Sequence, residues 1–543
     1  MLVLTVAAGA CSDHGSGNTV TVTSASPTRV SVLTHHNDNA RTGANLAETV
    51  LTPDVVRSQF GYLFALPVDG QMYAQPLYVA DLDVGPGEKH DVVFVATEHD
   101  SVYAFDANDP RPPLWQVSLG TSATLSCFDE MILVPELGIT GTPVIDRTTN
   151  TLYVVAFTVD DPTSCAHGNF HQMLYAIDIT TGQLRAPPVD IVQPVAPAFV
   201  PRQALQRSAL LLTNGMLYIA FASHQGLEPY HGWLFAYDTA TLSQRGAFTT
   251  TPSALDGSIW MSGSGPAVDE NGFIYVTSGN GSFDGRDNWA DSLLKLSFDG
   301  DHFTIVDSFT PYNQAELQAK DLDLGSMGPI LIPGRHSIAR QLRRLVLIGG
   351  KEGRLYLVDR DQLGGFHADG DYVPERLSVT TSFIYGGATY FDDGTTSHLY
   401  VWPAESDLDA FALGDSKDGQ YLLPTGTSTV PRTKGLPGGF LSLSANGTAG
   451  GVLWANHPWS PDDGGDASAI VKIVPGVLYA FDAADPSVEL WSNRLDPNAS
   501  AESYGHFAKF CPPTVANGKV YFPVWHPDDP NAPGAVLVYG KLP

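Results

Sequence analysis

The sequence is poor in charged residues, and above all in basic ones. Only 16% of its 543 residues are charged, and 29 Lys and Arg stand against 58 Asp and Glu, which gives a formal net charge of −29. This balance argues against binding to nucleic acid, which draws on basic side chains and counterion release. It argues equally against docking on anionic lipid. We interpret the negative charge as a source of solubility.

Cysteine is scarce as well, with four residues in the chain. No Cys-x-x-Cys-His motif occurs, so the sequence predicts no c-type haem. Cys127 and Cys165 lie on neighbouring repeats and are candidates to pair, whereas Cys511 lacks an obvious partner. Sequence alone does not settle this connectivity. Beyond the N-terminus no run of 18 apolar residues occurs, which excludes a membrane-spanning helix in the body of the chain.

Residues 1–11, MLVLTVAAGAC, are apolar and small and lack a basic start. They predict a secretory signal whose beginning is clipped or wrongly assigned. The small residues before Cys11 also resemble a bacterial lipoprotein cleavage site, and a plain signal and a lipidated Cys11 stay equally open. Residues 12–34 are rich in Ser and Thr and predict a flexible tether. We therefore expect an exported protein, secreted, periplasmic or at the cell surface, with membrane contact only through a lipid anchor.

Glycine and proline, by contrast, are plentiful, at 53 and 39 residues, and suit many short strands joined by tight turns. The strongest signal is an internal repeat, in which an alternating apolar segment ends near an Asp or a small residue. The eight copies are SVYAFDAND (101–109), MLYAIDITT (173–181), WLFAYDTAT (233–241), LLKLSFDGD (293–301), RLYLVDRDQ (354–362), DLDAFALGD (407–415), VLYAFDAAD (477–485) and AVLVYGKLP (535–543).

Each copy is the third of four strands in a unit, after a short Pro-containing strand and a strongly apolar one. Four antiparallel strands repeated radially predict an all-β fold, an eight-bladed β-propeller spanning residues 61–543. The last repeat has only three strands, and GYLFALPV (61–68) ahead of the first repeat would supply the fourth and close the ring. A solenoid is the alternative, but it would need capping units and leaves the borrowed strand unexplained. Residues 35–60 form a lead-in segment.

The repeats resemble those of the quinoprotein alcohol dehydrogenases. The likeness rests on FDANDPRPPLW (105–115), FDAADPSVELW (481–491) and the lead-in HHNDNARTGANLAETVLTPDVV (35–56). The resemblance implies blades that dock through Trp residues around a central pocket. In that pocket it implies pyrroloquinoline quinone with a calcium ion. Repeats by themselves specify a fold and not an activity.

The resemblance also implies site residues. Trp260 would be the floor on which the quinone stacks, and Asp323 the catalytic base. Lys351 would lie beside the quinone carbonyl and act both in catalysis and in cofactor binding. Asn280, in a Gly-Asn-Gly turn, would bind both the cofactor and the metal. Asp323 would be a second metal ligand, and Glu228 would complete the metal ligands after a one-residue shift.

Other interpretations stay open for these residues. Asn280 would equally be a turn residue in the left-handed conformation. Trp260 would equally pack between blades, and Lys351 would equally be an exposed residue of a hairpin. Asp321 and Asp323 also suit turn chemistry. Gly325 stands where lanthanide-dependent members have a second Asp, which favours calcium, a cation that takes oxygen ligands.

The chain also departs from the family. The adjacent Cys-Cys pair over the quinone is absent, because Cys127 stands alone. Where the family binds the quinone carboxylate, only Gln75 and Tyr73 are near. Without a haem, electrons would leave to a separate acceptor. Five histidines are expected on loops of the same face without metal-ligand spacing: His99, His224, His457, His506 and His526.

Three functions are compatible with these residues. The first is an oxidoreductase that uses pyrroloquinoline quinone and calcium to oxidise the CH–OH group of a small alcohol or carbohydrate, and that needs an external electron acceptor. The second is a non-catalytic binding or scaffold propeller that lost the cofactor. The third is a carbohydrate lyase or hydrolase that uses His, Lys and Glu residues of the central funnel.

Overall fold

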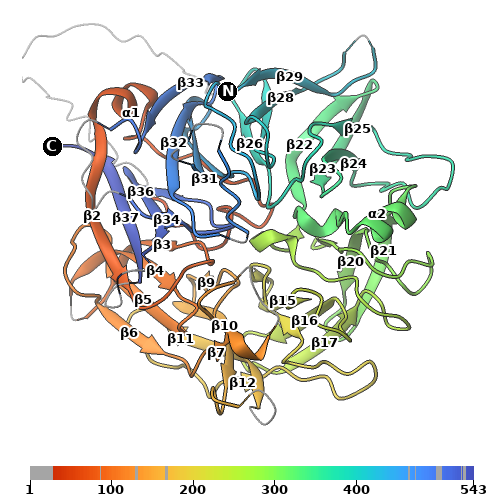
Figure 1. Cartoon of the computed structure of the whole chain (residues 1–543), viewed down its shortest axis with the longest axis horizontal. Coiled ribbons are helices and arrows are strands. Elements are labelled where there is room, and N and C mark those ends of the chain that lie inside the picture. The colour runs from red at the N-terminus through yellow and green to blue at the C-terminus, as the bar shows by residue number, and fades with distance from the viewer. Residues whose placement is uncertain are drawn as a thin grey trace, which may run out of the picture.

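The computed structural model describes residues 29–543 except 86, 129–132, 165–168, 417, 461, 463–464, 471, 497–503, 527–528 and 530–532. These residues form eight small antiparallel sheets arranged as a ring (Figure 1). The prediction of an all-β, eight-bladed propeller is confirmed. The predictions for residues 1–28, including a signal and a lipidated Cys11, lie outside the described residues.

The strands of each blade follow one another in the chain, and the first lies at the inner edge. In blades 1 to 4 they are β3 (Leu77–Asp83), β4 (Lys89–Ala96), β5 (Ser101–Asp106), β6 (Trp115–Ser118); β9 (Val144–Asp146), β10 (Thr151–Val159), β11 (Phe170–Asp178), β12 (Val189–Asp190); β14 (Leu211–Thr213), β15 (Met216–Ser223), β16 (Trp233–Asp238), β17 (Gln244–Thr249); and β18 (Ala267–Val268), β19 (Ile274–Thr277), β20 (Leu293–Phe298), β21 (Phe303–Phe309).

In blades 5 to 7 the strands are β22 (Ile330–Ile338), β23 (Gln341–Gly349), β24 (Arg354–Asp359), β25 (Glu375–Ser378); β26 (Thr389–Asp392), β27 (Ser397–Val401), β28 (Asp409–Leu413), β29 (Leu422–Thr427); and β30 (Phe440–Asn446), β31 (Ala449–Pro458), β32 (Gly476–Asp482), β33 (Asp485–Ser492). The short strands outside this pattern are β1 (Ala44–Asn45), β7 (Ala123–Thr124), β8 (Glu136–Leu137) and β13 (Ala204–Leu205). The helices are α1 (Pro53–Gln59), α2 (Gln314–Lys320) and the 3-10 turns η1 (Leu125–Cys127), η2 (Met261–Gly263) and η3 (Leu324–Ser326).

The eighth blade joins the two ends of the chain. Strands β34 (His506–Phe507) and β35 (Thr514–Ala516) both pair with β36 (Lys519–Trp525), which is followed by β37 (Gly534–Lys541). The outer strand is β2 (Phe60–Val68), antiparallel to β37. The predicted closure by residues 61–68 is therefore correct, and it leaves no open gap in the ring where a sheet edge would await pairing.

The apolar core lies between neighbouring blades. Val92 and Phe94 of β4, for example, pack in one buried cluster with Leu152 and Val154 of β10. Because each blade is covered on both faces, its central strands are nearly continuous apolar runs, and every residue of β10 is buried. The ring thus keeps its shape through face-to-face packing of sheets, which fixes the positions of the loops at the two ends of each strand.

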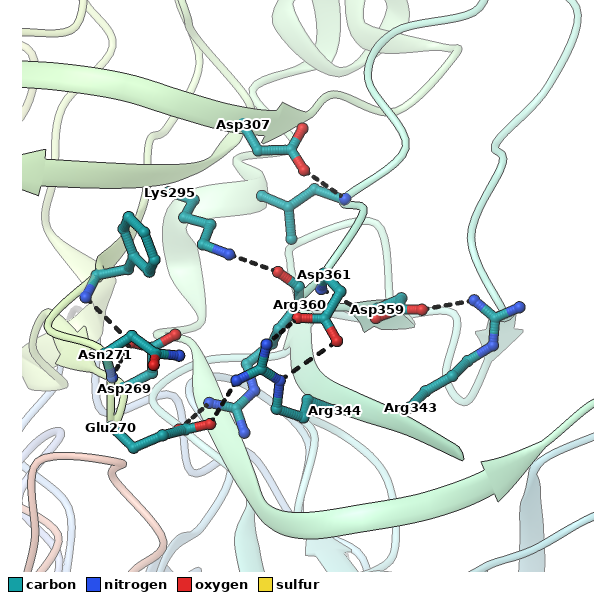
Figure 2. A network of polar contacts seen from close by, with 12 residues as sticks. Asp269, Glu270, Asn271, Lys295, Asp307, Arg343, Arg344, Asp359, Arg360 and Asp361 are labelled. Atoms are coloured by element: carbon teal, nitrogen blue, oxygen red, sulfur yellow. Dashed lines mark hydrogen bonds and ion pairs between the residues drawn. The ribbon is translucent and has the colours of Figure 1, made fainter. Parts of the chain in front are cut away.

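The junctions between blades use two different kinds of contact. Between blades 1 and 2, the Trp115 indole covers Gly182, where a Cβ would lie 2.9 Å from the ring, and its N–H donates to the Ile179 carbonyl at 3.0 Å. This is the kind of Trp docking that the family resemblance implied. Between blades 4 and 5 a polar network takes its place (Figure 2). There the Lys295 ammonium donates to the Arg360 carbonyl at 2.7 Å, and Glu270 pairs with the Arg360 guanidinium at 3.2 Å.

Residues 32–48, which we call the axial segment, reach the inner strand of every blade. In blade order, the bonded pairs are Val32–Tyr78, Leu33–Ile145, Asn39–Leu212, Asn39–Val268, Ala40–Leu331, Thr42–Tyr390, Gly43–Leu443 and Asn45–Val515. Six of these strands are the inner blade strands by their order in the sheets, and β14 and β35, which pair with β15 and β36, fill that place in blades 3 and 8. The predicted lead-in is therefore a strap across the interior of the ring and not a separate segment.

Arg41 is the buried anchor of the axial segment, with no exposed surface. Its guanidinium donates to the carbonyls of His35, Leu210 and Pro266 at 2.9, 3.1 and 3.0 Å, and to the Thr34 hydroxyl at 2.7 Å. Leu210 and Pro266 precede the inner strands of blades 3 and 4. One side chain therefore satisfies buried acceptors from three parts of the chain.

The boundary of the predicted tether is wrong at its C-terminal end. Val32 is fully buried and forms an antiparallel bridge with Tyr78, and Arg29 pairs with Asp91. Residues 29–34 are therefore part of the folded ring, because apolar and charged side chains within a Ser/Thr-rich stretch find partners on blade 1. No helix in the described part of the chain has the length and apolar character needed to cross a membrane.

We predict that Arg41→Ala lowers the free energy of unfolding by about 3 kcal/mol or more, because four buried acceptors lose their donor at once. Denaturant unfolding followed by Trp fluorescence measures the change. Arg57→Ala, on the exposed side of α1, is the matched control and should stay within about 0.5 kcal/mol of the unmodified protein. Equal stabilities for the two variants would show that the strap does not hold the ring.

Candidate active site

One cavity of about 480 Å³ lies where the loops between second and third strands meet the links between blades. Trp260, Asn280, Asp323 and Lys351 all line it, although they come from four separate loops of the chain. The structure thus brings together the four residues on which the sequence-based hypothesis depended. The other lining residues are Leu133, Leu205, Arg207, Ala222, Ser223, Gln225, Gly226, Tyr230, Ser258, Asp321 and Phe510.

Asp323 and Lys351 form the charged centre of the cavity wall. The Lys351 ammonium lies 2.5 Å from Asp323 Oδ2, and the Lys351 backbone N–H donates to the Asp323 carbonyl at 3.0 Å. Asp323 Oδ1 accepts the backbone N–H of Asn280 at 2.6 Å. Both oxygens of this buried carboxylate therefore have donors, which fixes its orientation.

The surroundings of Asp323 act on its pKa in opposite directions. Burial of the carboxyl raises its pKa above the usual value, and the positive charge of Lys351 offsets part of that rise. For Lys351, burial by itself would lower the pKa, but the charges of Asp323 and Asp321 outweigh it, and the pKa is raised. The result is a charged lysine beside a carboxylate that binds a proton more readily than an exposed one does.

Asn280 lies between two glycines because other backbone and side-chain atoms approach both positions. A Cβ on Gly279 would lie 2.6 Å from Asp323 Oδ1, and one on Gly281, at φ 147°, would lie 2.5 Å from the Gly257 nitrogen. The Gly257 N–H in turn donates to the Asn280 carbonyl at 2.8 Å. The glycines therefore serve the packing of successive loops against one another, and Asn280 lines the cavity between them.

The same close packing of loops explains why residue 325 is a glycine. A Cβ at this position would lie 2.6 Å from the Gly279 nitrogen and 2.6 Å from the carbonyl carbon of Ser278. The missing Asp at this position was the reason to expect calcium and not a lanthanide. The structure gives a steric reason for glycine here, since no side chain fits against the neighbouring backbone without movement.

Aromatic side chains form the remaining walls around Lys351. Its ammonium lies 5.6 Å from the centre of the Trp260 ring, in the range of a cation–π contact. Tyr385 meets Trp260 edge-on, with ring centres 6.0 Å apart. Trp260 therefore lines the cavity and also packs against buried residues of several blades, so both interpretations of this residue apply.

Arg207 is the main residue that the sequence analysis missed. It is 3% exposed, lines the cavity, and its guanidinium lies 4.8 Å from the Phe510 ring centre and 5.7 Å from that of Tyr73. It precedes the inner strand of blade 3, within QALQRSALLL, where no motif distinguishes it from a surface residue. Only the closure of the ring, which brings Phe510 of blade 8 beside it, identifies it as part of the cavity.

Gln75, the residue considered for the quinone carboxylate, has a structural role. Its side chain accepts the His36 N–H at 3.0 Å and donates to the Pro513 carbonyl at 3.4 Å, and it is buried. Gln75 does not line the cavity. It binds the axial segment to blade 8, so its polar atoms are already used.

Glu228 also lies away from the cavity lining. Its side chain is exposed, and its negative charge acts on Asp256, whose pKa is raised first by burial and then by Glu228. The neighbouring Tyr230 lines the cavity instead. A tyrosine two residues beyond Glu228, and not a carboxylate, therefore forms this part of the wall.

The histidines do not form a cluster at the cavity, since none of the five lines it. His457 lies within β31 and His506 within β34, so their predicted loop positions are wrong. His224 is 2% exposed, and burial lowers its pKa to about 3. His99 pairs with Glu136 at 3.0 Å. Among the residues that the structure describes, no histidine lines the cavity, so none of the five is placed there for acid–base chemistry.

Two of the four cysteines lie in the described residues. Cys127 is disulfide-bonded, and Cys511 is a buried free thiol. The predicted partner of Cys127, Cys165, lies outside the described residues. Within those same residues, no group of three or more His, Cys, Asp or Glu side chains is arranged to hold a metal ion.

A second cavity of about 480 Å³ lies between blades 4 and 5, at the opposite ends of their strands. Arg344 and Arg360 line it, but both already pair with Glu270, at 2.8 and 3.2 Å (Figure 2). None of the residues singled out from the sequence lies there. This cavity belongs to the junction between the blades.

Comparison with known proteins gives a match at the level of fold. No family model matches the chain, and no curated protein matches its sequence. Among solved structures, a quinohemoprotein alcohol dehydrogenase from Pseudomonas putida HK5 is similar, with 15% identity, a TM-score of 0.57, and coverage of 94% of this chain and 80% of that one. The quinohemoprotein alcohol dehydrogenase from Comamonas testosteroni is similar too, with 14% identity, a TM-score of 0.56, and coverage of 94% of this chain and 81% of that one.

A europium-containing methanol dehydrogenase is similar as well, with 12% identity, a TM-score of 0.55, and coverage of 94% of this chain and 98% of that one. The chain therefore has the propeller fold of the quinoprotein alcohol dehydrogenases, and the resemblance drawn from the repeats is confirmed for the fold.

We predict that Gly325→Ala lowers the melting temperature by several degrees and weakens any ligand binding at the cavity, because its Cβ would meet backbone atoms at 2.6 Å. Gly414→Ala is the control, since a Cβ there has only an ordinary contact at 3.9 Å. Thermal unfolding measures both variants. If Gly325→Ala were as stable as Gly414→Ala, the close packing of the two loops would be wrong.

Proposed function

We propose that this protein is a quinone-dependent oxidoreductase that acts on the CH–OH group of an alcohol or a sugar. The observation that supports it is the meeting of Trp260, Asn280, Asp323 and Lys351 in one cavity, within the fold of the quinoprotein alcohol dehydrogenases. A scaffold that had lost its ligand would have no need of a buried carboxylate held by donors on both oxygens. The cavity volume is that of an ordinary cofactor or ligand site.

The residues of the cavity fit pyrroloquinoline quinone, a flat aromatic molecule that carries several carboxylates. Trp260 supplies a flat face for stacking. Arg207 and Lys351 supply positive charge at the wall, and a guanidinium is suited to bind a carboxylate through two N–H groups. Since Arg207 already contacts Phe510 and Tyr73, its side chain needs little further ordering when an anion binds.

When bound, the quinone supplies the acceptor for a hydride from the carbon of the alcohol. Asp323 takes the hydroxyl proton of the substrate, because burial makes its carboxylate a stronger base than usual. Lys351 holds Asp323 in place and places positive charge where the substrate oxygen gains negative charge. The apolar wall residues Leu133, Leu205 and Phe510 keep water from this centre.

The chain fits a calcium ion less well than it fits the quinone. Of the three ligands that the resemblance implied, Asn280 and Asp323 line the cavity and Glu228 does not. Asp323 already pairs with Lys351, and calcium takes six or more oxygens. Calcium therefore stays a prediction, and the roles given above to Asp323 and Lys351 do not depend on it.

The fate of the electrons and the location of the protein are part of the same proposal. The absence of a Cys-x-x-Cys-His motif in the sequence argues that a separate acceptor takes the electrons. Export to the periplasm or cell surface follows from the N-terminal signal, which stays a prediction. The nature of the alcohol or sugar is open to a substrate screen.

We predict that adding pyrroloquinoline quinone to the apo protein raises its melting temperature and shifts the absorbance of the quinone. Trp260→Ala should weaken quinone binding by about tenfold, the loss of one aromatic contact. Tyr372→Ala, an exposed aromatic outside the cavity lining, is the control. Titrations with and without calcium show whether the metal adds affinity. If the quinone produced neither effect under either condition, the proposal would fail.

We predict that kcat/KM rises with pH through an acid limb set by Asp323, because only its deprotonated form accepts the proton. The pKa of Asp323 is raised, so this limb lies above the usual 3.8. Lys351→Met removes the charge that lowers this pKa and should move the limb further up, by about 1–3 units. A dye-linked assay over a pH series, at saturating quinone, measures the shift. An unchanged or lower limb would contradict the role given to Lys351.

A further inference from the structure

The cavity between blades 4 and 5 gathers positive charge in an otherwise acidic protein. The chain has 29 Lys and Arg against 58 Asp and Glu, yet the guanidinium groups of Arg335, Arg344 and Arg360 all line this one space of about 480 Å³. Apolar residues form the rest of its wall, among them Ala40, Val268, Leu331, Ile332 and Pro333. A wall that is cationic in one part and apolar in another matches an organic anion, whose carboxylate needs donors and whose body needs apolar contact.

Arg360 supplies the observation that points to a ligand. Its side chain is 5% exposed, and its Nη1 donates to Glu270 Oε2 at 3.2 Å. Its Nε–H is buried as well, and it has no acceptor among the residues that the structure describes. A buried donor without an acceptor costs free energy. This nitrogen therefore indicates that an acceptor enters the cavity that Arg360 lines.

Arg335 brings a second guanidinium that is not yet used. It is exposed and lines the same cavity, and its side chain forms no hydrogen bond or ion pair with the part of the chain that the structure describes. The pKa of Asp361 is lowered first by its hydrogen bond from Arg344 and to a smaller extent by the charge of Arg335. Arg335 therefore lies close enough to the other arginines to act on the same charges.

The surrounding strands hold two of the arginines in place before any ligand arrives. The Arg360 N–H donates to the Arg344 carbonyl at 2.7 Å, and the Lys295 ammonium donates to the Arg360 carbonyl at 2.7 Å (Figure 2). Arg344 Nε also donates to Asp361 Oδ2 at 3.3 Å. Because these contacts fix the backbone and one guanidinium in advance, little further ordering remains when an anion binds.

Two acidic residues also line the cavity, and they are bonded in different ways. Asp269 accepts hydrogen bonds on both carboxylate oxygens, from N–H groups of its own turn and from the Tyr275 hydroxyl. Glu270 is 54% exposed and pairs with the guanidinium groups of Arg344 and Arg360, at 2.8 and 3.2 Å (Figure 2). Glu270 is thus an exposed counterion that competes with a ligand carboxylate, whereas Asp269 is held within its turn.

We propose that this cavity binds a small organic anion, a monocarboxylate with an apolar body. The carboxylate pairs with Arg335 and takes the place of Glu270 at Arg360, where it also accepts the Nε–H. The body of the molecule lies against the apolar wall. Because the cavity lies at the opposite ends of the strands from the candidate active site, this is a second site, and it does not depend on the proposed oxidoreductase function.

Isothermal titration calorimetry with benzoate tests the site, with benzamide as the neutral molecule of the same shape. We expect benzoate to bind and benzamide not to bind. Arg335→Ala should weaken benzoate binding by about tenfold, because a charged hydrogen bond is lost. Glu270→Gln should strengthen it several-fold, because the competing carboxylate is gone. A general loss of structure would not move the two variants in opposite directions.

The matched control is Arg340→Ala, which changes an exposed arginine at the turn of the same β22–β23 hairpin, outside the cavity lining. Its benzoate affinity should equal that of the unmodified protein. Inorganic phosphate, an anion without an apolar body, should bind more weakly than benzoate. The proposal is wrong if benzoate does not bind, if benzamide or phosphate binds as tightly, or if either Arg335→Ala or Glu270→Gln leaves the affinity unchanged.

A photoreactive benzoate locates the ligand directly. Irradiated para-azidobenzoate should label residues near Val268 or Pro333, as located by tandem mass spectrometry, and excess benzoate should prevent the labelling. Arg335→Ala should lose most of it. Labelling confined to the candidate active site, for example near Tyr230 or Phe510, would place the anion there and overturn the inference.

Discussion

The hydrogen bonds between the axial segment and the inner strands are the constraint on which the rest of the structure depends. A ring of blades has no central layer of its own, because each sheet packs only against its two neighbours. Residues 32–48 fill the axis and bond to every blade in turn, with the Arg41 guanidinium buried at the centre. The blades are thus fixed to one another along the rim by packing and at the axis by a single strap. The loops at the strand ends are therefore held in fixed positions as well.

The site is an outcome of that fixed geometry. Its loops contact each other through backbone atoms, with Gly279 and Gly325 in direct contact and the Asn280 amide bonded to Asp323. Since the Asn280 N–H and the Lys351 ammonium hold the two oxygens of the Asp323 carboxylate, the base needs no ligand to orient it. Lys351 then neutralises part of its charge within an apolar wall, where such pairing is stronger than in water. In a chain with a net charge of −29, the cavity wall carries Arg207 and Lys351 beside two carboxylates, Asp321 and Asp323.

The accuracy of the sequence analysis varied with the range of the interactions involved. The repeats predicted eight blades and the closing strand at residues 61–68, because alternation of apolar residues is a local pattern that each strand repeats. The resemblance placed Trp260, Asn280, Asp323 and Lys351 in one cavity, since these residues lie at fixed distances from recognisable strands. Glu228 does not line the cavity, because in its loop the side chain of Tyr230, two residues further along, lies there instead. Arg207 was missed because its neighbours, Phe510 and Tyr73, come from distant parts of the chain.

The sequence by itself determined the fold class, the number of blades and the loops that carry the candidate residues, because these follow from periodicity and from contacts between neighbours in the chain. Tertiary structure alone decided that the lead-in crosses the axis, that Gly325 is fixed by the backbone of another loop, and that Lys351 joins a buried aspartate to an exposed one. Those features depend on atoms that are brought within a few ångströms only when the ring closes. No local pattern records such distances.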